Sequence, residues 1–450
     1  MIMIGSMFPV LNARLHLSPD SSFVAKLSSE RERTGLNKVA AEMLMYCDGT
    51  VTVDEIINQI ISKYSLRKTS ELYNGLVEFF IESKNLGHVV ISPEEHKITP
   101  IISGSLKYFA PESIQIELTQ QCPLKCEHCY VYAAPDKLVR MPFELVDNLL
   151  DQAKVLGVSN IVLTGGDPMM HPNFWEILEK ASTKFYNVNL LTSGYLIDEK
   201  VAAKISKYRN INVQISVDGI EDTHNNFRGK TDAFLRTIKA FKNLQKYNTK
   251  VVWALTITGD NFEELEECIK LAKSVGVKVF RPGIVFNTGR AMSHDMNDAT
   301  FIKKIKQKLS GLQTKYNDEN FKVDGVEGSS VQSSDSESQK ATQQTNCGAG
   351  WNFCHITAKG EVLACPVFPY ELTNLNNDNL LDYFSTKDVK IRMLQSPKKE
   401  ICKNCPHLER DNGCPAHGLI SSQSNPYCAW KDTIDPDVRN RIQQDVYTTI

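Results

Sequence analysis

Six strand-like segments, separated by amphipathic helices, dominate the middle of this chain between residues 113 and 290. Each segment is short and rich in apolar and β-branched side chains, which is typical of buried strands. Strands that alternate with helices in series form a parallel sheet, and six units are too few for the usual closed eight-stranded barrel. The predicted fold class is therefore α/β, with a partial, open (β/α)6 barrel. The expected strands are Ser113–Leu118, Asn160–Thr164, Val188–Thr192, Asn212–Val217, Val251–Thr256 and Lys278–Arg281.

Regions of different character flank this barrel. The first 96 residues combine short extended segments with three expected helices, and Thr52 with Glu55 forms a capping box before the second helix. This pattern predicts a winged-helix-like domain, although a packing or dimerisation domain would show similar elements. The expected domains are 1–96 winged-helix-like, 97–112 linker, 113–310 barrel, 311–346 bridging region with a Ser-rich linker, and 347–450 cysteine-rich.

Charge and hydropathy exclude several classes of protein. The formal net charge is −2, which gives no electrostatic basis for binding nucleic acid or an anionic membrane. No apolar run approaches the roughly 20 residues of a membrane span, and the N-terminus does not resemble a secretory signal. We therefore expect a cytoplasmic protein, in which the 12 cysteines are more suited to metal binding than to disulfides.

Three cysteines lie directly after the first expected strand, at Cys122, Cys126 and Cys129, with the spacing CxxxCxxC. Three thiolates on one loop can hold three irons of a [4Fe-4S] cluster and leave the fourth iron open to a substrate. Zinc is the alternative, with His128 as a fourth ligand, although structural zinc sites usually have paired CxxC ligands. This spacing favours the iron–sulfur cluster.

The cysteine run resembles that of the radical S-adenosylmethionine (radical SAM) superfamily, and short motifs after later strands strengthen the resemblance. These are Gly-Gly-Asp-Pro after strand two, Thr-Ser-Gly after strand three and Ser-Val-Asp-Gly after strand four. The resemblance implies that the open iron binds S-adenosylmethionine, that one electron cleaves it, and that the resulting 5′-deoxyadenosyl radical abstracts hydrogen. Arg236 is a rival to Arg228 as partner of the cofactor carboxylate. The implied cofactor-binding residues are Tyr130, Gly165, Gly166, Asp167, Ser193, Ser216, Asp218 and Arg228.

A second group of cysteines, from Cys347 to Cys428, resembles a SPASM domain, the extension that holds two auxiliary iron–sulfur clusters. The resemblance implies auxiliary cluster one on Cys347, Cys354 and Cys365, and auxiliary cluster two on Cys402, Cys405, Cys414 and Cys428. Gly418 stands where the family has a further cysteine. We therefore expect auxiliary cluster one to have an open iron, or one bound by His417. A structural or electron-relay cluster, or zinc at the CxxC pair, is the alternative.

Residues 10–92 resemble the precursor-recognition element of peptide-modifying enzymes, which binds a leader peptide as an added strand. Together these resemblances imply a thioether-forming maturase of ribosomally made, cysteine-rich peptides, with three [4Fe-4S] clusters and an electron donor such as flavodoxin or ferredoxin. The substrate thiolate would bind auxiliary cluster one. A maturase that makes carbon–carbon crosslinks, epimerises or oxidises residues, and a leader-binding electron-relay protein without enzymatic activity, are the alternatives.

Two remaining features are less specific. Cys47 and Cys268 stand alone on helix-like segments and are expected to be buried small hydrophobes. Arg281 and Arg290, near the end of strand six, can face the mouth of the active site.

Overall fold

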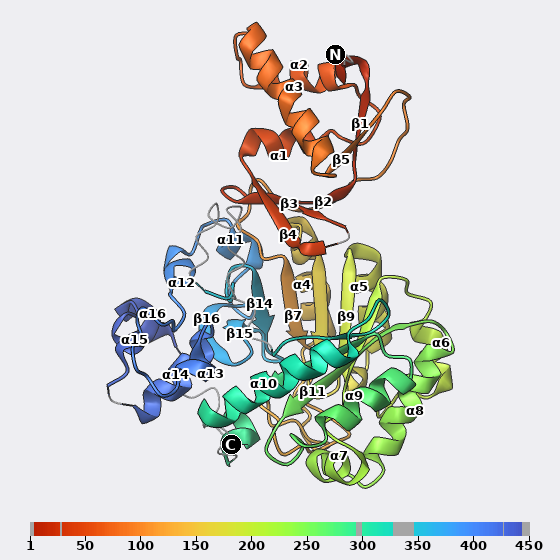
Figure 1. Cartoon of the computed structure of the whole chain (residues 1–450), viewed down its shortest axis with the longest axis vertical. Helices are drawn as coiled ribbons and strands as arrows, with labels where there is room; N and C mark the ends of the chain where they lie inside the picture. Colours follow the sequence, from red (N-terminus) through yellow and green to blue (C-terminus); the bar gives the residue numbers. More distant parts are fainter. Residues whose placement is uncertain (1–3, 28, 294–298, 327–345, 426, 443–450) are drawn as a thin grey trace. The chain divides into compact units, whose positions relative to one another are not determined.

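The computed structural model describes residues 4–27, 29–293, 299–326, 346–425 and 427–442. The chain divides into two compact units, described here one at a time (Figure 1). The first contains residues 1–112 with residues 384–387, and the second contains most of the remainder. No described helix is both long and apolar enough to cross a membrane.

The first unit contains two small sheets and three helices. Its helices are α1 (Lys38–Met45), α2 (Val53–Lys63) and α3 (Ser70–Asn85). Strands β1 (Phe8–Leu11) and β5 (Val89–Ser92) pair antiparallel. A second sheet has the order β4 (Ser29–Leu36), β3 (Ser22–Lys26), β2 (Ala13–Leu17) and β6 (Ile101–Gly104).

Local sequence explains the helix positions in this unit. The capping box predicted at Thr52 and Glu55 is confirmed at the start of α2, where it satisfies backbone N–H groups that the helix itself cannot. The apolar stripe of α2 then buries Ile56 and Ile60 completely against Leu15 of β2 and Phe80 of α3.

The predicted linker over residues 97–112 was wrong. Ile101–Gly104 forms strand β6, which pairs parallel with β2, and the compact unit continues to Glu112. The backbone hydrogen bonds of this segment therefore go to the sheet. Because the strand has only four residues with one apolar pair, its sequence shows no periodic pattern from which a strand could be predicted.

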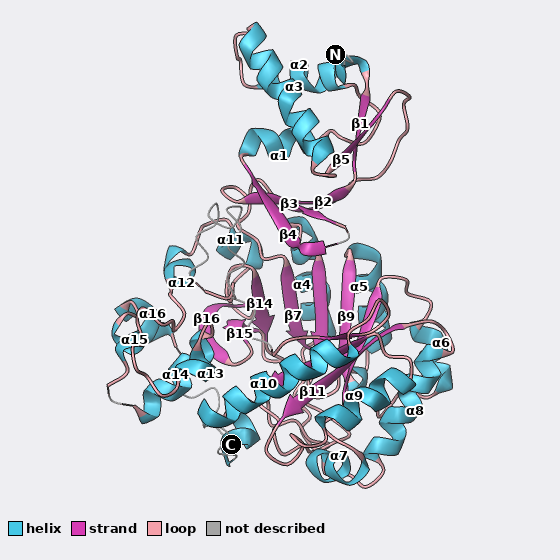
Figure 2. Ribbon diagram, viewed as in Figure 1, coloured by secondary structure: helices cyan, strands magenta, loops and turns pink. Residues whose placement is uncertain are grey.

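The second unit is built on one ten-stranded sheet with the order β13-β12-β11-β10-β9-β8-β7-β14-β15-β16 (Figure 2). The strands from β13 to β14 run parallel, and β15 and β16 are antiparallel additions. All six strands predicted in the barrel are confirmed, with shifts of at most three residues at their ends. The bounds are β7 Ser113–Glu117, β8 Asn160–Thr164, β9 Asn187–Thr192, β10 Ile211–Ser216, β11 Lys250–Ile257, β12 Val279–Ile284, β13 Lys322–Val323, β14 Phe353–Ile356, β15 Glu361–Cys365 and β16 Phe368–Asn374.

Helices connect the parallel strands and continue into the cysteine-rich region. The connecting helices are α4 Phe143–Leu156, α5 Phe174–Lys184, α6 Glu199–Ile205, α7 Glu221–Arg228, α8 Ala233–Gln245, α9 Leu265–Ser274 and α10 Ala299–Tyr316. The later helices are α11 Leu380–Phe384, α12 Val389–Met393, α13 Leu408–Asp411, α14 Pro415–Ser424, α15 Ala429–Asp432 and α16 Pro436–Arg441.

One predicted boundary in this unit was also wrong, because residue 310 falls inside helix α10. Strands β14 to β16 of the cysteine-rich region extend the barrel sheet. Strand β14 pairs directly with β7, so the two cysteine regions belong to one sheet. The predicted Ser-rich linker lies almost entirely outside the described residues.

The two faces of this sheet differ in polarity. Gln115, Val162, Asn189 and Asn212 are register partners on neighbouring parallel strands, so their side chains share one face, which we call the inner face. The residues between them, such as Ile114, are buried on the opposite face. The inner face is therefore the polar side of the sheet, and it continues onto Glu117, two residues after Gln115.

Candidate functional site

The loop after β7 gathers the first three cysteines. Cys122 and Cys126 are buried, and Cys129 is partly exposed. Burial raises the pKa of Cys122, and the charges of Asp167, Cys126 and Cys129 raise it further. Burial and the Cys126 charge likewise raise the pKa of Cys129. Three mutually repelling thiols on one loop fit a polynuclear iron–sulfur cluster, whose positive irons would relieve the repulsion.

Two glycines of the motif after β8 hold this loop close to the sheet. A Cβ on Gly165 would overlap the carbonyl oxygen of Thr119, and a Cβ on Gly166 would overlap that of Gln121. Gly165 also has a φ of +147°, which side-chain-bearing residues rarely adopt. The backbone N–H of Gly166 donates to Thr119 O at 2.6 Å. These glycines are thus required for backbone packing against the cysteine loop.

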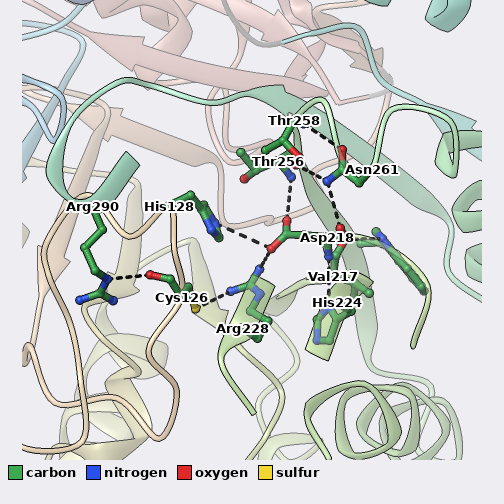
Figure 3. Close-up of polar contacts among 11 residues, drawn as sticks. Cys126, His128, Val217, Asp218, His224, Arg228, Thr256, Thr258, Asn261 and Arg290 are labelled. Carbon is green, nitrogen blue, oxygen red and sulfur yellow. Dashed lines mark hydrogen bonds and ion pairs between the residues drawn. The ribbon is translucent and has the colours of Figure 1, made fainter. Parts of the chain in front are cut away.

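Arg290 clamps the same loop from beyond β12. Its Nε donates to Cys126 O at 2.7 Å (Figure 3). Its Nη2 donates to Ala133 O at 2.7 Å. The sequence indicated only that this arginine can face the site mouth. Its partners are loop carbonyls, which no sequence pattern identifies.

The carboxylate of Asp167 accepts hydrogen bonds from other residues of the chain. Its Oδ2 accepts hydrogen bonds from Thr192 Oγ1 at 2.8 Å, Ser193 Oγ at 2.7 Å and Ser193 N at 3.1 Å. Asp167 is fully buried, and burial raises the pKa of its carboxyl group. It therefore joins the ends of β8 and β9. Sequence reasoning missed Thr192, although Thr next to Ser-Gly at a strand end was a usable signal.

Asp218, at the end of β10, forms a buried charge network (Figure 3). It pairs with Arg228, and His128 Nε2 lies 3.8 Å from its Oδ2. Although burial opposes ionisation, the Arg228 guanidinium lowers the pKa of Asp218. Arg228 Nη1 also lies 3.5 Å from Cys126 Sγ. The network connects β10 and α7 to the cysteine loop.

The structure shows where three residues with predicted cofactor roles lie: Arg228, Arg236 and Ser216. The predicted cofactor residue Arg228 is already paired with Asp218, whereas its rival Arg236 pairs with Asp232 and is 53% exposed. Ser216 is the last residue of β10 and shares the inner face with Gln214. It therefore lies at the carboxyl edge of the parallel strands, as the motif order predicted.

Tyr130 connects the first cysteine cluster to the second region. Burial raises the pKa of its phenol, and the nearby charges of Glu117, Cys129 and Cys365 raise it further, while a hydrogen bond with Gln115 lowers it. The phenol therefore reaches Gln115 on the inner face and is influenced electrostatically by both Cys129 and Cys365. Sequence reasoning placed Tyr130 against adenine and did not anticipate its hydrogen bond with Gln115.

The later cysteines form two groups. Burial raises the pKa of Cys365, and the thiolates of Cys347 and Cys414 add to this. Burial also raises the pKa of Cys414 to about 12, with a contribution from Cys347. Burial raises the pKa of Cys402, a backbone hydrogen bond with Lys398 lowers it, and the charges of Cys405 and Cys428 raise it further. Cys414 is thus linked electrostatically to Cys347 and Cys365, whereas the resemblance grouped it with Cys402, Cys405 and Cys428.

Strand register places Cys354 on the other face of the sheet from Cys365, with which the resemblance grouped it. Its register partner on β7 is Ile114, on the buried face, whereas His355 is opposite Gln115 on the inner face. Cys365 follows that inner face, because it lies two residues after Leu363, the partner of His355. Cys354 is fully buried, and burial alone raises the pKa of its thiol. Strand alternation therefore separates Cys354 from Cys365.

His417, the other expected ligand, stacks on Phe286 with 4.0 Å between ring centroids and an angle of 11°. Burial and the nearby Arg410 lower the pKa of His417 to about 3. In the described part of the chain, no three His, Cys, Asp or Glu side chains are positioned to hold a single metal ion.

Two family models match the chain. Residues 116–286 match the radical SAM superfamily, and residues 347–406 match the SPASM iron–sulfur cluster-binding domain. These ranges contain the first cysteine cluster and most of the second.

Among curated relatives, the chain is 29% identical to the antilisterial bacteriocin subtilosin biosynthesis protein AlbA of Bacillus subtilis, over 95% of this chain and 97% of AlbA. It is also 29% identical to the sporulation killing factor maturation protein SkfB of the same species, over 68% of this chain and 70% of SkfB. Among solved structures, Streptococcus suis SuiB bound to precursor peptide SuiA matches with a TM-score of 0.64 and 16% identity, covering 92% of this chain and 97% of SuiB.

Proposed function

Because this chain is a radical SAM protein with a SPASM extension, of the type that includes peptide maturases, we propose that it installs thioether crosslinks in a ribosomally made precursor peptide. The crosslink joins a cysteine sulfur to a carbon of another residue. The observation that carries this proposal is that β7, which leads into the first cysteine loop, pairs directly with β14 of the SPASM region, so both cysteine regions share one sheet. A peptide held on the inner face at this point would meet the initiating site and an auxiliary site together.

The initiating cluster is held by Cys122, Cys126 and Cys129 in this proposal. Bound there, it supplies the electron that cleaves S-adenosylmethionine to methionine and a 5′-deoxyadenosyl radical. The motif residues Gly165, Gly166, Asp167, Ser193, Ser216, Asp218 and Arg228 line or support the cofactor site. Asp218 and Arg228 neutralise each other beside the cysteine loop, so they fix its position without adding net charge.

Two auxiliary clusters are each held by three cysteines in our revised assignment. Auxiliary cluster one takes Cys347, Cys365 and Cys414, and auxiliary cluster two takes Cys402, Cys405 and Cys428. This grouping keeps three protein ligands on auxiliary cluster one, as the missing cysteine at Gly418 suggested. A peptide thiolate is the proposed fourth ligand, which would hold the sulfur in place for bond formation.

The leader peptide is proposed to bind the first unit along β5. Among the described residues, β5 pairs with β1 along one edge and with no strand along the other edge. That second edge is therefore open to an added strand. Val90 of β5 is 51% exposed, Ile81 of α3 is 40% exposed, and Leu86 after α3 is 49% exposed. These exposed apolar side chains belong to β5 and to α3 and its C-terminal end, and α3 packs against β5, so they suit an extended apolar segment of a leader.

The test is reconstitution of the full chain with iron, sulfide, S-adenosylmethionine, a chemical reductant and a candidate cysteine-rich precursor. Formation of 5′-deoxyadenosine, a peptide mass lower by two hydrogens and protection of one thiol from alkylation would support the proposal. An unchanged mass with an inverted residue would indicate epimerisation, and loss of two hydrogens with all thiols free would indicate a carbon–carbon crosslink. If no 5′-deoxyadenosine forms, the protein would be a leader-binding electron-relay protein without enzymatic activity. The proposed physiological electron donor is flavodoxin or ferredoxin.

A further inference from the structure

The outer side of helix α8 carries a concentration of positive charge. Between residues 230 and 246 the chain has five Lys or Arg residues and one Asp, although its formal net charge is −2. The side of α8 that includes Phe241 is buried. Leu235, Lys239 and Lys242, spaced i, i+4 and i+7, are exposed on the opposite side, and Leu235 is 68% exposed. The helix therefore presents solvent with a basic stripe that includes an apolar side chain.

Most of this positive charge is not neutralised by the chain itself. Two of the five cations, Arg236 and Lys246, form ion pairs with acids. Within the described part of the chain, the other three form no ion pair. An exposed apolar side chain beside unpaired cations suits contact with an acidic protein surface, because a protein interface combines apolar contact with a polar rim. We call the set formed by Lys230, Leu235, Arg236, Lys239 and Lys242 the basic face.

The basic face begins beside the first cysteine loop. Ala233, the first residue of α8, packs in one buried group with Cys122 of that loop. Tyr195 belongs to the same group. Lys230 Nζ and Arg236 Cζ each lie 4.5 Å from the centre of the Tyr195 ring. One tyrosine side chain therefore connects two cations of the basic face to the packing around the cysteines.

The backbone of the cysteine loop also contacts the end of α7, which packs beside α8 (Figure 1). Lys125 N donates to Arg228 O at 3.3 Å, and Glu127 N donates to Phe227 O at 3.0 Å. A Cβ on Gly229 would lie 2.9 Å from Lys125 O. The loop therefore packs directly on the connection between α7 and α8, so this surface offers a short route from solvent to the first three cysteines.

We propose that the basic face is the docking surface for a small acidic electron-transfer protein, which reduces the cluster held by the first cysteine loop. The inference rests on the proposed function, because cleavage of S-adenosylmethionine needs an electron. In this step the donor loses one electron, the cluster gains it, and no covalent bond changes. Redox encounters use interfaces below about 1,200 Å², so one helix face with its flanking residues suffices. Complementary charge would raise the association rate by about 10- to 1,000-fold.

The test reverses two charges of the basic face, by Lys239→Glu with Lys242→Glu in the reconstituted full chain. The probe is an acidic flavodoxin. Binding of its oxidised, dye-labelled form is measured by fluorescence anisotropy, which does not depend on turnover. The matched control is Lys303→Glu with Lys304→Glu, because these lysines are exposed on α10 and their reversal changes the net charge equally. Formation of 5′-deoxyadenosine is then measured with reduced flavodoxin and, separately, with dithionite.

At low salt, flavodoxin should bind K239E/K242E about tenfold more weakly than the wild type or the control. Added salt should weaken binding to the wild type and the control steeply, and binding to K239E/K242E only slightly. With subsaturating flavodoxin, the rate of 5′-deoxyadenosine formation should fall about tenfold in K239E/K242E, whereas the rate with dithionite should be unchanged. If charge reversal lowers the iron content, Lys239→Gln with Lys242→Gln should retain iron and weaken binding about threefold.

Equal flavodoxin binding and equal flavodoxin-driven rates in K239E/K242E and the wild type would overturn the inference and leave the proposed function standing. A wild type that is active with dithionite but accepts electrons from neither flavodoxin nor ferredoxin would have the same consequence. So would binding to phosphatidylglycerol vesicles that K239E/K242E loses while its flavodoxin kinetics stay unchanged, which would assign the face to a membrane surface. If the wild type forms no 5′-deoxyadenosine with dithionite, the proposed function is overturned, and the binding constants still decide the docking surface.

Discussion

Replacing Cys354 by alanine is expected to leave the iron content of the protein unchanged. This variant separates the ligand assignment based on cysteine spacing from the one based on strand register. Cys354 is opposite Ile114 on the buried face of the sheet, whereas Cys365 follows the inner face. A side chain on one face of a strand cannot reach a cluster on the other face.

The expected cost of Cys354→Ala is small and purely a matter of packing. The side chain is fully buried, so removing one sulfur atom should cost about 1 kcal/mol, as for deletion of a single core methylene. The melting temperature should therefore fall by only a few degrees. Cys365→Ala should instead remove one [4Fe-4S] cluster, about a third of the iron in a protein with three such clusters.

The assay is iron and sulfide analysis of the anaerobically reconstituted full chain, together with electron paramagnetic resonance of the reduced clusters. Cys268→Ala is the matched control, since Cys268 is a fully buried thiol on α9. Cys354→Ala should match Cys268→Ala, and Cys414→Ala should match Cys365→Ala. Loss of about a third of the iron in Cys354→Ala would refute the register argument, and so would a normal spectrum for auxiliary cluster one in Cys414→Ala.

Three other substitutions probe the packing and charges around the site and in the first unit. Gly166→Ala should lower the unfolding free energy by about 1–3 kcal/mol and reduce the iron bound at the initiating cluster, because the added methyl group would meet the backbone of the cysteine loop. Gly311→Ala is the control: this residue lies in open space on α10, so the substitution should raise the unfolding free energy by about 0.5–1 kcal/mol in urea unfolding. Asp218→Asn leaves Arg228 buried without its counter-charge and should lower the unfolding free energy by about 3–5 kcal/mol; a loss below 1 kcal/mol would contradict the proposed buried pair. Burial lowers the pKa of His16 to about 4, so the unfolded chain binds the extra proton and stability should fall as the pH drops from about 6.5 towards 4. Urea unfolding of His16→Gln should show that acid-dependent loss reduced by up to about 3 kcal/mol, and an unchanged pH profile would contradict this assignment.

The parts of the fold that the sequence predicted are those with strong local patterns. The six barrel strands and the capped helix after Thr52 carry their signals within a few residues, as strand patterning and a capping box. Strand β6 and the junction of β7 with β14 depend on pairing between segments far apart in the chain. Such pairings are set by the tertiary structure, and for this reason the predicted linker over residues 97–112 failed.

The site shows the same division in its chemistry. Spacing was enough to bring Cys122, Cys126 and Cys129 together, because three residues on one short loop cannot lie far apart. Spacing was not enough for the later cysteines, because the interval from Cys354 to Cys365 spans a turn between two strands, and the strand alternation then decides which face each thiol occupies. One residue of difference in register places Cys354 in the core and His355 on the inner face. The same register that takes Cys354 away from the proposed auxiliary cluster brings His355 Nε2 to 3.6 Å from Glu117 Oε2, so the iron content of Cys354→Ala tests this register directly.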